Sequence, residues 1–139
     1  MSNVYKRNRT QSPLDVINKS KELLKETYFI IMNDNKVPKK HRYFIGKSLY
    51  DSANKIVSCT FCANNIFPKC KDDLINRRAH QNNALYECAL FLNLLDTYSD
   101  ILINVSYKDV EKLAVLANSI KALITAWIKS DTKQFEKFL

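Results

Sequence analysis

The sequence predicts an all-α protein, an antiparallel up-down-up-down four-helix bundle. Three observations lead to this prediction. The 139 residues include one glycine and three prolines, too few for the frequent turns of a β architecture. Apolar residues recur every three to four positions along four long segments. Connections of about two to six residues separate these segments, so neighbouring helices are expected to run in opposite directions.

A chain of this length is large enough for one hydrophobic core but not for two. Its hydrophobic content of 46% excludes a disordered chain. No apolar run reaches the roughly 18 residues that span a membrane, and the N-terminus is polar. We therefore expect a single domain over 1–139, with a flexible arm at 1–11 and a tail at 131–139. The protein is expected to be soluble and cytoplasmic, without membrane contact.

The first helix is expected to begin at Ser12 and Pro13. Serine is a preferred N-cap, proline suits the first helical position, and Asp15 supplies an acid in the first turn. The Asn-Asp-Asn run at 33–35 ends the helix with residues that tolerate a turn. The expected buried face consists of Leu14, Ile17, Leu24, Tyr28 and Ile31.

The second helix is expected to run from about Pro38 to Ile66, because proline disfavours helix for the residue before it. Pro68 stops it, and Gly46 is expected to permit close approach of a neighbouring helix. Its predicted core positions are Ile45, Leu49, Ser52, Ile56, Cys59, Ala63 and Ile66. Its apolar surface is wider than one stripe and also includes Tyr43, Phe44, Tyr50, Val57 and Phe61.

The third helix is expected to start around Asp72 or Asp73 and to last to about Ile103. Its first part, with Arg77, Arg78 and His80, precedes the apolar pattern and is expected to project toward solvent. Its predicted core positions are Ala84, Cys88, Phe91, Leu95, Tyr98 and Leu102.

The fourth helix is expected to begin at Ser106, an N-cap followed three residues later by Asp109, and to end at Ser130 and Asp131. Phe135 and Phe138 lie in the charged tail, which is expected to form a short helical turn folded onto the bundle. A partner-docking segment is the alternative. The predicted core positions of the helix are Val110, Leu113, Ala117, Ile120, Ile124 and Trp127.

The net charge of +8 is concentrated in one part of the chain. Residues 36–78 carry ten Lys and Arg but three Asp and Glu, a localised excess typical of a polyanion binder. The alternative is a solvated face that keeps the protein soluble. In a simple bundle the clusters at 39–47 and 69–78 lie near opposite ends, and Tyr43 and Phe44 are placed to stack bases. The candidate nucleic-acid contacts are Lys39, Lys40, Arg42, Lys47, Lys69, Lys71, Arg77 and Arg78.

The sequence offers little for catalysis. Its two histidines, His41 and His80, belong to no recognisable constellation, so we expect no enzyme and no cofactor. Cys59 and Cys62 form a C-x-x-C inside a continuous apolar helix, whereas metal and redox pairs occupy turns or helix starts. Core packing is therefore the favoured interpretation of the cysteines, with metal or redox chemistry as the alternative, and we expect no disulfide.

The opening of the second helix resembles a known family. Residues 37–49 contain Pro38-Lys39-Lys40, Arg42-Tyr43, Gly46 and Leu49, which fit the pattern P-K-x-x-R-[YF]-x-x-G-x-x-[LI]. This pattern is similar to that of small bacterial four-helix-bundle proteins: the accessory variability determinants (Avd) of diversity-generating retroelements and the ribosomal-RNA intervening-sequence proteins. The likeness covers about residues 14–129 and continues at residues 77–78, 84–87, 113–114, 120 and 126–128.

The resemblance implies a barrel-shaped homopentamer with a basic surface, in which the wide apolar surface of the second helix makes subunit contacts. In the retroelement branch the barrel binds the reverse transcriptase and its template RNA during mutagenic copying. The matching positions are Lys39, Lys40, Arg42, Arg77 and Arg78. The expected function is thus a non-catalytic oligomeric accessory protein that binds RNA or DNA and a reverse transcriptase. The alternative is a structural or protein-interaction bundle without nucleic-acid binding.

Overall fold

The computed structural model describes residues 13–139, in which all regular structure is helical. The prediction of an all-α protein with four long helices is confirmed. The long helices are α2 (Pro13–Ile31), α4 (Lys47–Asn64), α5 (Lys71–Ser99) and α6 (Tyr107–Gln134). Shorter elements are α3 (Lys39–His41), the π-helix η1 (Arg42–Gly46) and the 3-10 turn η2 (Glu136–Phe138). The arm at 1–11 and the expected N-cap Ser12 lie outside the described residues.

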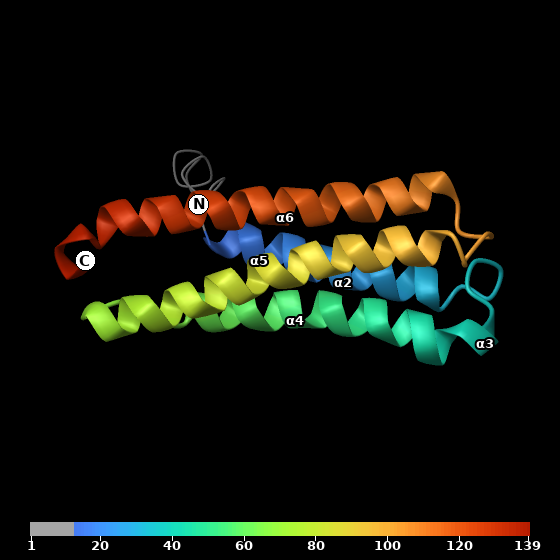
Figure 1. The fold of residues 1–139 in the computed structure, drawn as a ribbon, viewed down its shortest axis with the longest axis horizontal. Helices are drawn as coiled ribbons and strands as arrows, with labels where there is room; N and C mark the ends of the chain where they lie inside the picture. Colours follow the sequence, from blue (N-terminus) through green and yellow to red (C-terminus); the bar gives the residue numbers. More distant parts are fainter. Residues whose placement is uncertain (1–12) are drawn as a thin grey trace, which may run out of the picture.

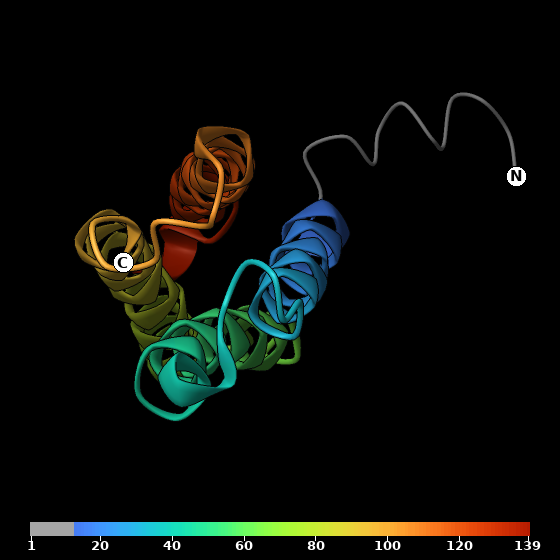
Figure 2. The same ribbon diagram turned by 90° about the vertical axis from the view of Figure 1, so that its right-hand side faces the viewer.

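The four long helices lie side by side along the long axis of the molecule, and their connections fall at alternate ends (Figure 1). Helix α2 contacts α4 and α6, and α5 contacts the same two helices, so the four form a closed ring of neighbours. Figure 2 looks onto the end that carries α3 and shows the helices end-on around a shared interior. The core fills this interior, with Leu23, Ile56, Phe91 and Ile120 fully buried.

The buried face of α2 differs from the predicted one. Leu14 and Tyr28 are 40% and 46% exposed, so their assignment to the core was wrong. Two polar residues, Ser20 and Thr27, are buried in their place. Each hydroxyl donates to the backbone carbonyl four residues earlier, at 2.8 and 2.7 Å, so neither requires a partner on another helix. The face that packs into the core consists of Val16, Ile17, Ser20, Leu23, Thr27, Ile30 and Ile31.

The second predicted helix is not continuous α-helix. After Pro38 it forms the short α3, then five residues of π-helix in η1, and only then α4. A π-helical turn often marks a functional or strained position. Gly46 closes this turn against α2, where an added Cβ would lie 2.7 Å from the Cγ2 of Ile31. The expected close approach of a helix at Gly46 is therefore confirmed.

The predicted core of the last three helices largely agrees with the structure. Ser106 caps α6 as expected, because its Oγ accepts a hydrogen bond of 3.1 Å from the backbone N–H of Asp109. The predicted end at Asp131 was wrong: α6 continues to Gln134, and Asp131 is buried. The tail forms the expected helical turn. Phe135 is buried there, and the centroid of its ring lies 5.6 Å from that of the Phe67 ring.

Helix α6 is long and apolar enough, by length and composition, to cross a membrane. The same composition is found in core helices of soluble bundles, and 33% of its most apolar window is buried inside the structure. Its buried side, from Leu113 to Asp131, contributes to the core between α2 and α5.

Candidate nucleic-acid interface

The two basic clusters lie at opposite ends of the bundle, as predicted. Lys39 and Lys40 belong to α3 at one end, and Lys69 and Lys71 lie at the turn between α4 and α5 at the other (Figure 1). The 29 residues of α5 run between these ends, a length of about 44 Å at 1.5 Å per residue. The clusters therefore form two separate surfaces on one copy of the chain.

Arg42, a predicted nucleic-acid contact, also has a structural role at the end of α2. Its Nε donates to the carbonyl of Ile31 at 2.9 Å, and its Nη2 donates to that of Met32 at 3.1 Å. These carbonyls belong to the end of α2, where a cation compensates the helix dipole and satisfies otherwise unpaired acceptors. The guanidinium also pairs with Asp34. Three of its five N–H donors are thus used within the chain, and the two of Nη1 remain for a phosphate.

Arg77 is also structural, and the expectation that its part of the helix projects toward solvent was wrong. The residue is 7% exposed, and its Nε and Nη2 donate to the two carboxylate oxygens of Asp131 at 2.7 and 2.8 Å. Its Nη1 donates to the carbonyl of Ile66 at 2.9 Å, and the guanidinium lies 5.0 Å from the centre of the Trp127 ring. All of these partners are internal, so Arg77 is removed from the set of candidate contacts.

The remaining cations at the α3 end are accessible. Lys39 and Lys40 are exposed in the only turn of α3. Lys47 is exposed as well and donates to Asp51 at 2.7 Å; this hydrogen bond and the carboxylate charge raise the pKa of the lysine. Tyr43 and Phe44, predicted to stack bases, are 72% and 73% exposed beside them. This end therefore presents ammonium groups and flat aromatic rings together.

The other end gathers more positive charge than the sequence indicated. Lys69 and Lys71 are exposed, and Arg78 is half-buried, with its Nη2 donating to the Thr132 hydroxyl at 2.9 Å. That hydrogen bond joins α5 to the last turns of α6, which carry Lys129 and Lys133. Two open grooves meet there at Leu139, one lined by Lys71 and Arg78 and the other by Lys129 and Lys133.

Lys129, Lys133 and Lys137 are the candidate residues that sequence analysis missed. They belong to a half of the chain whose charges balance, so counting along the sequence gave no signal. The signal that was available is topological. A fourth helix that returns along the bundle brings its last turns back to the end where the third helix begins, as Figure 1 shows.

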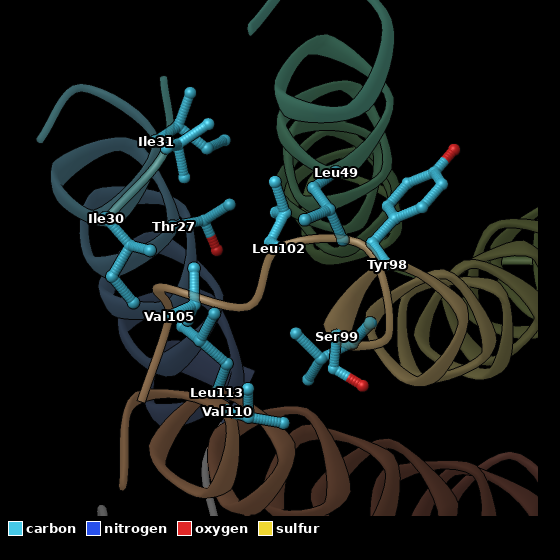
Figure 3. A pocket seen from close by; sticks show the side chains of 12 residues that line it. Thr27, Ile30, Ile31, Leu49, Tyr98, Ser99, Leu102, Val105, Val110 and Leu113 are labelled. Carbon is cyan, nitrogen blue, oxygen red and sulfur yellow. The ribbon is translucent and has the colours of Figure 1, made fainter. Parts of the chain in front are cut away.

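A small apolar cavity inside the bundle does not suit a ligand. It lies beneath the connection from α5 to α6, where Ile30, Leu49, Leu102 and Leu113 point into it (Figure 3). Its volume of about 20 Å³ is near that of a single water-sized probe, and no polar surface lines it. Small apolar voids of this kind stay dry, so this space is a packing defect.

The cysteines occupy different environments. Cys88 is buried, and burial raises the pKa of its thiol to about 12, so it is inert at neutral pH. Burial also raises the pKa of Cys59, which is half-buried one turn before the exposed Cys62. Cys70 is exposed in the turn before α5. Within residues 13–139, no three His, Cys, Asp or Glu side chains are placed together to hold a metal ion.

Comparisons with protein-family models, curated proteins and solved structures give no match to this chain.

Proposed function

We propose that this protein is a non-catalytic, oligomeric accessory protein that binds nucleic acid. The observation that carries the proposal is the gathering of accessible cations at both ends of one helical rod. Lys39, Lys40, Lys69 and Lys71 are exposed, and none of them forms an ion pair with a described carboxylate. Unpaired ammonium groups on an ordered surface attract phosphates, and their binding releases the counterions that surround the nucleic acid. Binding is therefore backbone-directed, with no preference for base sequence.

The proposal includes the more specific assignments that the family resemblance implies. We infer an antiparallel up-down-up-down bundle that assembles as a homopentamer in the cytoplasm. It binds the reverse transcriptase of a diversity-generating retroelement together with its template RNA or cDNA. A ring of five copies would present five times as many cations as one copy at each basic end. Several weak phosphate contacts made together then give a high overall affinity through multivalency.

The outward surface of α5 supports self-association. Between Ala79 and Leu95 the helix has one charged residue, Glu87, which is half-buried. The exposed residues of this stretch are all small, apolar or amide side chains, namely Ala79, Asn82, Asn83, Tyr86, Ala89, Leu90 and Asn93. A protein with a net charge of +8 that keeps a helix face free of charge offers a surface on which two copies meet without repulsion.

The test is a binding titration with a labelled structured RNA and a DNA duplex at 50 and 200 mM salt. Binding that weakens by about tenfold or more with salt is expected for two or more phosphate contacts. The variant Lys39→Glu with Lys40→Glu should weaken binding further while leaving helicity unchanged. The matched control, Lys55→Glu with Lys121→Glu, reverses the same charge in the middle of the bundle. No binding even at low salt would refute the proposal.

A protein-interaction bundle without nucleic-acid binding is the alternative, and one observation favours it. Four large apolar side chains at the α3 end are more than 70% exposed: Tyr43, Phe44, Ile103 and Tyr107. Such residues are enriched at protein interfaces. This alternative predicts no salt-dependent nucleic-acid association. It still predicts a complex of defined mass, which light scattering measures.

A further inference from the structure

A shallow groove lies on the outer surface where α2 meets the start of α4. Its walls include Tyr28 from α2, Met32 directly after that helix, and Lys47 and Tyr50 from α4, and its volume is about 190 Å³. The rings of Tyr28 and Tyr50 lie edge to face, with centroids 6.3 Å apart. Two aromatic rings from different helices thus meet at the surface, although neither belongs to the predicted base-stacking pair.

The local backbone brings α2 and the start of α4 close together at this groove. Gly46 lines the groove, and its missing side chain lets α4 approach Ile31 of α2 closely. The π-helical turn before it places Tyr43 one turn ahead of Lys47, where the two side chains are neighbours. Tyr43 therefore lies outside the lining of the groove but beside Lys47, which does line it.

The charge around the groove favours an anionic occupant. Both carboxylates at its edge are already paired, Asp34 with Arg42 and Asp51 with Lys47. Lys39 and Lys40 add two exposed cations without such partners. A second copy presenting the same groove would bring like charges together, so self-association through this face is disfavoured. An occupant with both negative charge and flat apolar faces fits best.

We propose that this groove binds a single-stranded segment of nucleic acid, with unpaired bases stacked on Tyr28, Tyr50 and Tyr43 and phosphates on Lys39, Lys40 and Lys47. The inference rests on the proposed nucleic-acid function and adds the form of the ligand. Aromatic stacking requires bases that are free of a duplex stack, whereas lysines alone accept single and double strands alike. RNA and DNA share this chemistry, since every base has an aromatic face.

The experiment compares fluorescein-labelled 12-mers of uridine and of deoxythymidine with a duplex of the same length, by anisotropy over a salt series. Both single strands should bind at least about fivefold more tightly than the duplex. The variant Tyr28→Ala with Tyr43→Ala should weaken single-strand binding by at least about 25-fold, because two stacked bases are lost and each contributes substantially. The slope of the logarithm of the binding constant against the logarithm of the salt concentration should not change, since no phosphate contact is lost. Val115→Ala, which truncates a 58% exposed apolar side chain on α6 outside the groove and the self-association surface, is the control and should leave binding unchanged.

The possible outcomes separate this inference from the function on which it rests. Duplex binding as tight as single-strand binding, or unchanged affinity in the tyrosine variant, overturns the stacking groove and leaves the phosphate-binding proposal standing. Absence of binding to every probe at low salt overturns both. Preference for uridine over deoxythymidine, or the reverse, identifies which single strand the groove accommodates best.

Discussion

The buried pair of Arg77 and Asp131 offers a quantitative test of the fold through the variant Asp131→Asn. The carboxylate accepts three hydrogen bonds: two from the guanidinium, at 2.7 and 2.8 Å, and one from Gln81, at 2.8 Å. An asparagine has one acceptor oxygen, so at least one of these bonds is replaced by two donors facing each other. The guanidinium also keeps its charge in a buried site without a compensating anion.

The magnitude follows from these losses. Removing one partner of a buried ion pair costs about 3–5 kcal/mol. With an unfolding entropy of about 2.1 cal/mol/K per residue over 139 residues, this corresponds to a fall in Tm of about 10–17 °C. The apolar pair Arg77→Met with Asp131→Leu removes both charges at once. We expect it to recover part of the lost Tm, since replacing a buried ion pair by packed apolar side chains is often neutral or stabilising. Recovery is incomplete because the buried amide of Gln81 loses its acceptor.

The assay is thermal unfolding followed by circular dichroism at 222 nm, with urea unfolding as an independent measure of the free energy. Asp96→Asn, at an exposed position of α5, is the control for loss of one carboxylate and should change stability by less than about 0.5 kcal/mol. If Asp131→Asn proves as stable as Asp96→Asn, the ion pair does not hold the bundle end together and the reasoning fails.

Three further predictions follow from local geometry. Gly46→Ala should destabilise the fold by about 1–3 kcal/mol, because its Cβ would lie 2.7 Å from Ile31; urea unfolding should show that Ile31→Ala reduces this cost in a double-mutant cycle. The hydrogen bond from Lys36 lowers the pKa of Asp109. The ionised carboxylate therefore stabilises the fold above the unfolded pKa of about 3.9, and this stabilisation is lost as pH falls through the folded pKa. The Tm difference between wild type and Asp109→Asn should therefore be constant above pH ~5 and shrink at lower pH; a constant difference down to pH ~2 would contradict this. A thiol reagent should label exposed Cys62 within minutes and buried Cys88 only on unfolding; mass spectrometry of digested protein distinguishes them, and rapid labelling of Cys88 would contradict its burial.

Local patterns predicted most of the fold. The cap at Ser106 depends on residues three apart, and the core positions Ile56 and Phe91 follow from helical periodicity, so both were readable from the sequence. The buried hydroxyls of Ser20 and Thr27 were missed because a polar residue breaks an apolar pattern even when it satisfies itself within its own helix. That omission shifted the predicted face of α2.

The candidate site was less predictable because it depends on contacts between distant residues. Arg77 and Asp131 are 54 positions apart, and nothing in either neighbourhood distinguishes a buried guanidinium from a solvated one. Lys133 joins Arg78 at one end of the bundle only through the return of α6. Charge counting located the basic segment, but it could not separate exposed cations from those that hold helices together.

The hydrogen bonds around Asp131 also affect how the end of α6 moves. Helix termini normally fray, and their amides exchange hydrogen with solvent at little cost in free energy. Here the last turns cannot open without exposing a paired charge, so amide exchange near Asp131 should be as slow as in the middle of the helix. Lys129 and Lys133 flank this residue on the same ordered turns. Their backbone is therefore already ordered, so a polyanion that bound there would incur a smaller entropic penalty than one that bound a loose basic tail.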